Sequence, residues 1–377
     1  FCGYRYFMPG ELGEIISKKE IINLPLKIDI KEEPSFITYT NAGFYGGNGN
    51  FSRSWRTTFL ASHNLYHIYS PEKYSESHPE YYPMIEGKRF IPPKNSGGTW
   101  QPCVSNPDLP EIAIEWSNEY FEKNPQMLGI PVGVNDGGGD CQCPDCLELK
   151  RKFKNQYIPF YNQIAKLAQK QFPDKLVSFI AYGGASPVPE NIKLEPNIYV
   201  EVASGLRENM KLLEGWSNAG AKNIGIYDYL YGGGYIVPRH YPHIMGKAWK
   251  EAYKSVNLKG GWFETFTQVW LYDGPRQYVL NELAWDIDAN IDKLLDDYFL
   301  NFYGEANKPM REFFDRIEEI YGRKKDPLHP MADWQSLKQL DEYIWDDLEY
   351  LNNKLNKAKE LLKDEIVKKR IDLFEKI

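Results

Sequence analysis

The chain has 377 residues, 42% of them hydrophobic, and a formal net charge of −7 with acidic and basic residues mixed throughout. This hydrophobic content is sufficient for a full core. The sequence has no block of basic residues, which argues against a nucleic-acid partner. No apolar run approaches the roughly 18 residues that a membrane-spanning helix needs. We therefore expect a globular protein with no nucleic-acid partner and no membrane span.

Short β-rich runs alternate with longer helical patterns along most of the chain. Residues 1–34 precede the first run, and we expect them to be a linker and the tail of a missing N-terminal α/β domain. The predicted strands are residues 35–45, 56–68, 99–105, 127–136, 175–184, 197–204, 223–233 and 258–266. The predicted helices are residues 106–125, 144–172, 206–220, 241–256 and 275–304. Asn106 is the expected cap of the first helix, with Pro107 at its first position.

Eight strand–helix units within residues 35–304 predict an α/β fold, a closed (β/α)8 TIM barrel. The near-continuous apolar runs are typical of parallel strands that are buried on both faces. An open doubly wound sheet is the alternative, but no Gly-rich phosphate-binding pattern supports it. Only helical patterns follow, so we expect residues 305–377 to form a C-terminal helical region. The chain begins without Met and ends inside a helical pattern, which suggests a fragment of a longer polypeptide.

Carboxylates fall near the ends of several predicted strands, where barrels of this kind carry their chemistry. Asp136 ends the fourth strand, Asp228 lies in the seventh, and Glu264 lies in the eighth. A carboxylate at the mouth of an apolar strand is costly unless it is paired or used. We predict Asp136 and Glu264 as the main catalytic pair, with Asp228 third. The alternatives are a turn-forming role for Asp136 and ion pairs for the others, such as Glu264 with Arg276.

Aromatic residues make up 15% of the chain, with 27 Tyr and 10 Trp. Composition favours a large aromatic core, although the apolar face of a sugar ring also suits an aromatic platform. The residues predicted to bind substrate near the strand ends are Asn135, His63, His67, Tyr182, Glu201, Tyr227, Tyr229, Trp262 and Trp270. For each of the two histidines a structural role is the alternative to ligand binding, and an ion pair is the alternative for Glu201.

Carboxylates among aromatic residues suit glycoside hydrolysis, in which one carboxyl group donates a proton and another acts in its ionised form. The same acids could instead bind Mg²⁺ or Ca²⁺, but the interleaved aromatics favour an organic ligand. The sequence contains no nucleophile-elbow, HExxH or P-loop motif. We therefore predict a glycosidase with an oligosaccharide or glycan substrate and no required cofactor.

Three cysteines, Cys141, Cys143 and Cys146, follow Asp136 in the stretch GVNDGGGDCQCPDC. With Cys103 or His78 as a fourth ligand, they could hold a structural zinc ion. A disulfide, for example to Cys103, and free packed thiols are the alternatives. In each case we expect the cluster to fix the loop beside Asp136.

Several phrases together resemble known families. The segment GYRYFMPGELGE (3–14) resembles the linker between an N-terminal α/β domain and the barrel in α-glucuronidases. A bacterial glycoside-hydrolase-like family, long filed as a domain of unknown function, resembles the chain from Gly3 to about Ala306. The segments that carry this resemblance are SESHPEYYPMIEGKRF, QPCVSNPDL, VGVNDGGGDCQCPDC and LNELAWDIDANIDKLLDDYFLNFYGEA. That family is related to the endo-β-N-acetylglucosaminidases of glycoside hydrolase family 163 and, more distantly, to β-hexosaminidases.

The resemblance implies an extracytoplasmic enzyme that acts on glycans, with a substrate-assisted, retaining mechanism if the substrate contains N-acetylhexosamine. β-Hexosaminidases place an Asp-Glu pair after the fourth strand, where this chain has Asn135-Asp136. An inverting, α-glucuronidase-like enzyme is the alternative, in which Asp136 would act with Glu201 or Asp228. A third possibility is a barrel that binds glycans without cleaving them.

Overall fold

The computed structural model describes residues 4–16, 21, 26–42, 61–203, 210–266, 269–329 and 331–377. These residues form two compact units. The central unit takes its residues from 57–228 and 252–262, and the terminal unit takes its residues from 1–56, 229–251 and 263–377. Across the described ranges, every helix is too short or too polar to cross a lipid bilayer.

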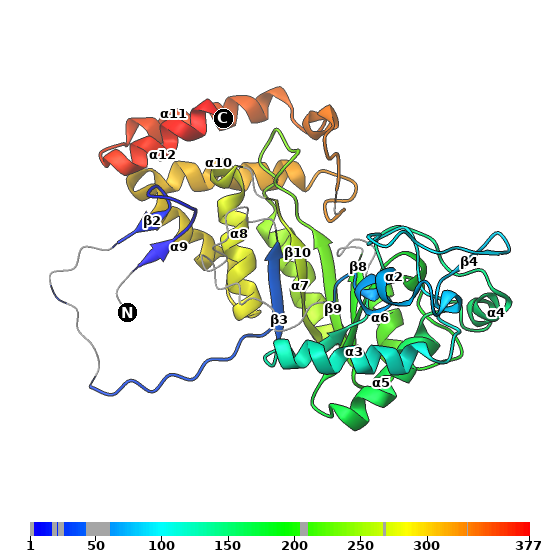
Figure 1. Ribbon diagram of the computed structural model, residues 1–377. Helices are drawn as coiled ribbons and strands as arrows, with labels where there is room; N and C mark the ends of the chain where they lie inside the picture. The colour runs from blue at the N-terminus through cyan, green and yellow to red at the C-terminus, as the bar shows by residue number, and fades with distance from the viewer. Residues whose placement is uncertain are drawn as a thin grey trace. The chain divides into compact units, whose positions relative to one another are not determined.

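One six-stranded sheet has the strand order β3-β10-β9-β8-β7-β6 (Figure 1). Its strands are β3 (Thr38–Ala42), β6 (Gly129–Pro131), β7 (Leu176–Ala181), β8 (Ile198–Ala203), β9 (Asn223–Tyr229) and β10 (Leu258–Glu264). The four strands β6 to β9 pair in parallel, with Ile130 opposite Val177 and Val200 opposite Ile224. Val and Ile are the commonest residues in these four strands and are all buried, as expected for parallel strands in a core.

The predicted closed barrel of eight strands is wrong, because the described residues form an open, six-stranded half-barrel. In the predicted strand 56–68, the described residues make a single bridge, from His63 to Gly133, before a helix begins at Leu65. The predicted strand 99–105 forms turns, and the preceding Gly98 makes one bridge with Asp136. Residues 71–102 contain six prolines and three glycines. Since proline cannot donate to a strand ladder and glycine weakens one, this segment does not supply the missing barrel strands.

Short elements replace the missing strands in the central unit, and longer helices follow them. The short elements are α1 (Leu65–Ile68), α2 (Pro71–Tyr74), η1 (Pro79–Tyr81) and the hairpin of β4 (Met84–Ile85) and β5 (Lys88–Arg89). The longer helices are α3 (Leu109–Lys123), α4 (Pro144–Phe153), α5 (Ile158–Gln171) and α6 (Met210–Asn218), and η2 (Gly183–Ala185) follows β7. Asp108, not Asn106, directly precedes α3. The predicted helix 144–172 divides because Lys154 adopts a left-handed conformation with φ 60°.

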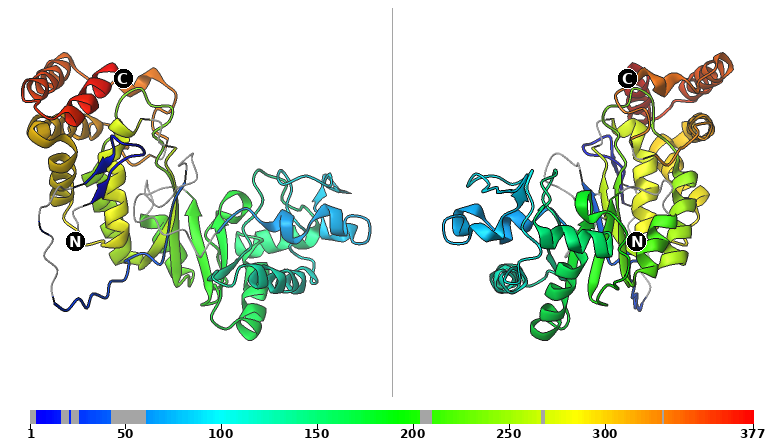
Figure 2. Two further views of the ribbon diagram at one scale, coloured as in Figure 1. Left: turned by 60° about the vertical axis from the view of Figure 1, so that its left-hand side comes forward. Right: turned by 90° about the vertical axis from the view of Figure 1, so that its right-hand side faces the viewer.

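Helices α5 and α6 cover one face of the central strands. The ring of Tyr161 on α5 stacks on Phe179 of β7 with centroids 4.3 Å apart. Trp216 on α6 contacts the same phenylalanine edge-on at 5.9 Å. Helix α3 lies beside α5 (Figure 2). Side chains that alternate with Phe179 along β7 therefore project from the opposite face of the sheet.

The terminal unit joins the first residues of the chain to its C-terminal helices. Its elements are the antiparallel hairpin of β1 (Arg5–Tyr6) and β2 (Glu14–Ile15), then α8 (Trp270–Trp285), α9 (Ile291–Tyr303), η3 (Gly304–Ala306), α10 (Asn307–Tyr321), η4 (Leu337–Leu340), α11 (Trp345–Glu360) and α12 (Glu365–Lys376). Helix α7 (Pro242–Val256) has residues in both units. The predicted helix 275–304 divides, since Asn290 caps α9 by accepting a hydrogen bond from the Lys293 amide at 3.0 Å. Helices α10 and α11 pack against each other (Figure 1).

Candidate functional site

The carboxyl ends of parallel strands meet at one edge of the sheet, which is where ligands bind in open α/β folds. This rule holds for open sheets as well as for closed barrels, so the same edge is the candidate site in the half-barrel. In the central unit, Asn135 and Asp136 follow β6, Tyr182 follows β7, and Glu201 lies near the end of β8. These residues therefore define the candidate site that can be described within one unit.

Asp136 is exposed and is held by a tyrosine from the neighbouring strand. The Tyr182 hydroxyl donates a hydrogen bond to its Oδ1 at 3.1 Å, and the Gly137 amide donates to the same oxygen at 2.9 Å. Partial burial and then the nearby Asp136 carboxylate raise the pKa of Tyr182, so this hydroxyl remains a donor. The backbone of Asp136 is also fixed, because its carbonyl accepts from the Thr99 amide at 2.7 Å.

Asn135 is fully buried and holds three segments together. Its Nδ2 donates to the Trp100 carbonyl at 2.9 Å, and its Oδ1 accepts from the Tyr66 amide at 2.7 Å. The Gln101 side chain bonds the Asn135 backbone twice: its Oε1 accepts from the Asn135 amide and its Nε2 donates to the Asn135 carbonyl, each at 2.9 Å. Both ends of the Asn135 side-chain amide thus bond to backbone groups of other segments. Asn135 is therefore a residue that positions Asp136. An aspartate here would lose the donor that binds Trp100.

The two predicted histidines have different surroundings. Nδ1 of His63 lies 2.6 Å from the Val134 carbonyl, so this nitrogen carries a proton and Nε2 is the other polar atom of the ring. The His63 ring meets the Tyr182 ring edge-on, with centroids 5.4 Å apart. His67 is exposed on α1 and packs on Tyr66. Of the two, His63 belongs to the surroundings of Asp136.

Glu201 is 4% exposed and lies on β8. Burial raises its pKa to about 8, and a hydrogen bond from the Tyr199 hydroxyl, 3.3 Å from Oε1, opposes this shift. A group with this pKa is mostly protonated at pH 7. Gly225 on β9 makes room for Tyr199, because a Cβ at that position would lie 1.8 Å from the tyrosine oxygen.

Aromatic residues share the sheet face that carries Glu201. The register places Glu201 between Ile180 and Gly225, and Ala203 opposite Tyr227. Tyr182 and Tyr227 pack against the cluster of Ala61, Ile180 and Tyr199 on this face. The rings of Tyr227 and Trp262 are nearly parallel, at 11°, with centroids 6.4 Å apart. This face of the central unit thus combines a buried carboxyl group with a row of aromatic rings.

Asp228 is buried, at 4% exposure, and lies between Tyr227 and Tyr229 on β9. Side chains alternate along a strand, so Asp228 projects from the face opposite to the two tyrosines. Asp228, the third predicted catalytic residue, therefore lies on the other side of the strand from the aromatic row.

Glu264, the last residue of β10, belongs to the terminal unit. The Tyr231 hydroxyl donates to its Oε2 at 2.6 Å, and the Tyr231 ring contacts Phe266 and Trp334. Burial and then the Glu264 carboxylate raise the pKa of Tyr231. Glu264 and Asp136 are thus each held by a tyrosine hydroxyl. Sequence reasoning did not select Tyr231, although it follows Tyr229 at the two-residue spacing of a strand.

Four buried cysteines lie together in the central unit. The thiols of Cys103, Cys141, Cys143 and Cys146 are free, and their sulfur atoms all lie within 4.8 Å of one another. Sequence reasoning offered His78 as an alternative fourth member, but its Nδ1 pairs with Glu80 at 3.0 Å and its ring stacks on Tyr81. The structure therefore selects Cys103.

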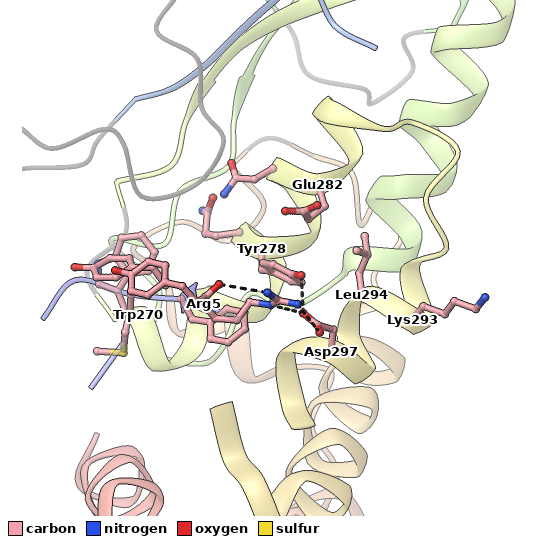
Figure 3. Close-up of a pocket in the computed structure, with 13 residues that line it drawn as sticks. Arg5, Trp270, Tyr278, Glu282, Lys293, Leu294 and Asp297 are labelled. Carbon is pink, nitrogen blue, oxygen red and sulfur yellow. Dashed lines mark hydrogen bonds and ion pairs between the residues drawn. The ribbon is translucent and has the colours of Figure 1, made fainter. Parts of the chain in front are cut away.

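A cavity of about 410 Å³ lies in the terminal unit, between the N-terminal hairpin and helices α8 and α9 (Figure 3). Trp270 contributes to its wall, together with Arg5 and Asp297. The Arg5 guanidinium pairs with Asp297 at 3.3 Å, and Tyr278 donates to the same carboxylate at 2.8 Å. Its described lining residues come from the hairpin and two helices, so the cavity does not lie at the carboxyl ends of the sheet strands.

The fold and the site define an α/β protein with a half-barrel sheet and polar and aromatic residues at the carboxyl edge of its strands. The family described as "Domain of unknown function (DUF4838)" matches residues 8–315. The chain therefore belongs to the DUF4838 family. No curated protein matches the sequence.

Proposed function

We propose that this protein is a glycoside hydrolase. The observation that carries the proposal is a pair of carboxyl groups in contrasting environments at one sheet edge. Glu201 is buried and holds its proton at neutral pH, whereas Asp136 is exposed to solvent and held by Tyr182. Glycoside hydrolysis requires one protonated and one ionised carboxyl group.

Each carboxyl group receives a role from its environment. Glu201 is the proton donor to the leaving oxygen, since burial keeps it protonated where an exposed carboxyl would be ionised. Asp136 supplies the negative charge that stabilises the positive transition state, orients an acetamido group or activates water. Tyr182 fixes the Asp136 carboxylate, and His63 stands edge-on to Tyr182.

The aromatic rows support a sugar as the substrate. Tyr182, Tyr227 and Trp262 offer ring faces and edges in the central unit, and Tyr231 and Trp334 do so in the terminal unit. Aromatic side chains combine a large apolar surface with polar edges, which suits the apolar face and hydroxyl rim of a pyranose. The narrower substrate class, glycans that contain N-acetylhexosamine, and an extracytoplasmic location rest on the sequence resemblance.

An activity screen on N-glycans, hexosaminides and uronides tests the proposal. The wild-type protein should cleave at least one class, and D136N and E201Q should each lower kcat/KM by about 100-fold or more. D174N and E190Q are matched controls, because Asp174 and Glu190 are exposed and Asp174 precedes the opposite, amino end of β7. Both controls should retain activity.

Two results would contradict the assignment. Full activity in both D136N and E201Q would remove these residues from the mechanism. Glycan binding by calorimetry without turnover of any substrate would instead support a binding protein. E264Q tests the predicted role of Glu264 separately, and its loss of activity at unchanged stability would add this residue to the catalytic groups.

A further inference from the structure

The four-cysteine cluster has a geometry that its members' positions in the sequence do not reveal. The Sγ of Cys103 lies 3.6 Å from that of Cys143 and 4.0 Å from that of Cys146. A disulfide requires about 2.05 Å between its sulfur atoms. These separations are too long for a covalent bond, and all four thiols are buried.

The same separations match four ligands around one metal ion. A Zn–S bond of about 2.3 Å in a regular tetrahedron places its sulfur atoms about 3.8 Å apart. The two separations given for Cys103 lie on either side of that value, and all four sulfur atoms lie within 4.8 Å of one another. Four thiolates in a tetrahedron are typical of a zinc site or of an iron–sulfur centre.

Polar hydrogens around the cluster would stabilise sulfur in its ionised form. The Met84 amide donates to Cys141 Sγ at 3.3 Å, and the Cys146 amide donates to Cys143 Sγ at 3.4 Å. Cys143 is the N-cap residue of the ten-residue helix α4, whose N-terminus favours negative charge. The Ser105 hydroxyl oxygen lies 3.2 Å from Cys146 Sγ. Such contacts are the outer-shell support that metal thiolates need.

We propose that Cys103, Cys141, Cys143 and Cys146 bind one structural Zn²⁺ ion. Binding releases four thiol protons to solvent and leaves a site with a net charge of minus two, which the amide donors and the N-terminus of α4 offset. All four positions are taken by protein, so the ion has no open site for substrate and its role is structural. This proposal is independent of the proposed hydrolase activity.

The zinc would tie together short segments of the central unit that lie far apart in the sequence. Cys103 lies in the turns before α3, and its amide bonds the Tyr81 carbonyl at 2.8 Å. Gln142, between two of the ligands, donates its amide to Met84 at 2.7 Å. The ion thus joins the 101–106 turns to the start of α4, and the Gln142–Met84 hydrogen bond links the β4–β5 hairpin to them. These segments flank the loop that begins at Asp136.

Elemental analysis of the full chain, purified without chelator, tests the proposal. About one zinc per chain is expected, and C103S and C146S should each lower it to less than roughly a tenth. C2S is the matched control, since Cys2 is not one of the four proposed ligands, and it should keep about one zinc.

A measurement on the wild-type protein covers the case in which the variants do not fold. A thiol-specific mercurial should release zinc in proportion to the thiols modified, as followed with a chromogenic chelator. Alkylation under denaturing, non-reducing conditions should modify all four cysteines of the cluster. Metal-free protein with reactive thiols, a disulfide within the cluster, or bound iron would each overturn the proposal.

Discussion

The substitution E201Q should stabilise the protein, and by an amount that depends on pH. Folded Glu201 keeps its proton up to a pKa of about 8, whereas the unfolded chain releases it near the ordinary value of 4.5. Between these values the unfolded state binds fewer protons, so wild-type stability falls by about 1.4 kcal/mol per pH unit. The neutral glutamine avoids this loss. Its advantage is small below pH 4.5, grows between pH 4.5 and 8 to on the order of 5 kcal/mol, and then levels off.

Denaturant unfolding of the wild-type protein, E201Q and the exposed control E190Q between pH 5 and 8 measures this difference. The gap between E201Q and wild type should widen steadily with pH, while E190Q should follow the wild type. A gap that is constant across this range, or that narrows as the pH rises, would refute the reasoning. In that case the buried carboxyl group is not protonated in the folded protein.

Three further substitutions test the geometry around Asp136. N135D should destabilise the protein by at least about 2 kcal/mol at pH 7, because it buries a charge and removes a hydrogen-bond donor. Denaturant unfolding measures this loss, and an unchanged midpoint would contradict it. G139A should lower the free energy of unfolding by about 1–3 kcal/mol in the same assay, since Gly139 has φ +88° and the new Cβ would lie 2.5 Å from the Thr99 carbonyl oxygen. Wild-type stability in this variant would contradict the turn at Gly139. Y182F should lower kcat/KM about tenfold with little change in stability, because Asp136 loses its tyrosine donor; unchanged kinetics would remove Tyr182 from the site.

The strands in the second half of the sheet could be predicted because their signal is local. The predicted runs 175–184, 197–204 and 258–266 contain β7, β8 and β10, which differ from them by three residues or fewer at either end. Continuous apolar runs bounded by turn residues suffice for such strands. The carboxyl ends of β7 and β8 then locate Tyr182 and Glu201, and the end of the predicted run 127–136 locates Asp136, without knowledge of the tertiary fold.

Whether the sheet closes into a barrel could not be predicted, because closure depends on pairing between segments that are distant in the sequence. The run 56–68 has a strand-like composition, but its described part forms one bridge and then α1. Helix breaks were missed for a related reason. Lys154 takes a left-handed conformation that its residue type does not favour, so the local sequence does not indicate the break between α4 and α5.

The site was predicted in part, and the gaps have physical causes. Tyr199 was missed although it lies two positions before Glu201, the spacing that puts both side chains on one strand face. The role of Asn135 depends on Trp100 and Tyr66, which are distant in sequence. Cys103 was one of several possible fourth members of the cysteine cluster, and only the fold brings it to the other three.

The most direct test of the central claim compares E201Q and the wild-type protein on two glycosides of the same sugar. One glycoside has a sugar leaving group that needs a proton, and the other has a dinitrophenyl leaving group that does not. E201Q should lose about 100-fold or more in kcat/KM on the first and less than about tenfold on the second. An equal loss on both substrates, or no loss on either, would contradict the assignment of Glu201 as the proton donor of a glycoside hydrolase.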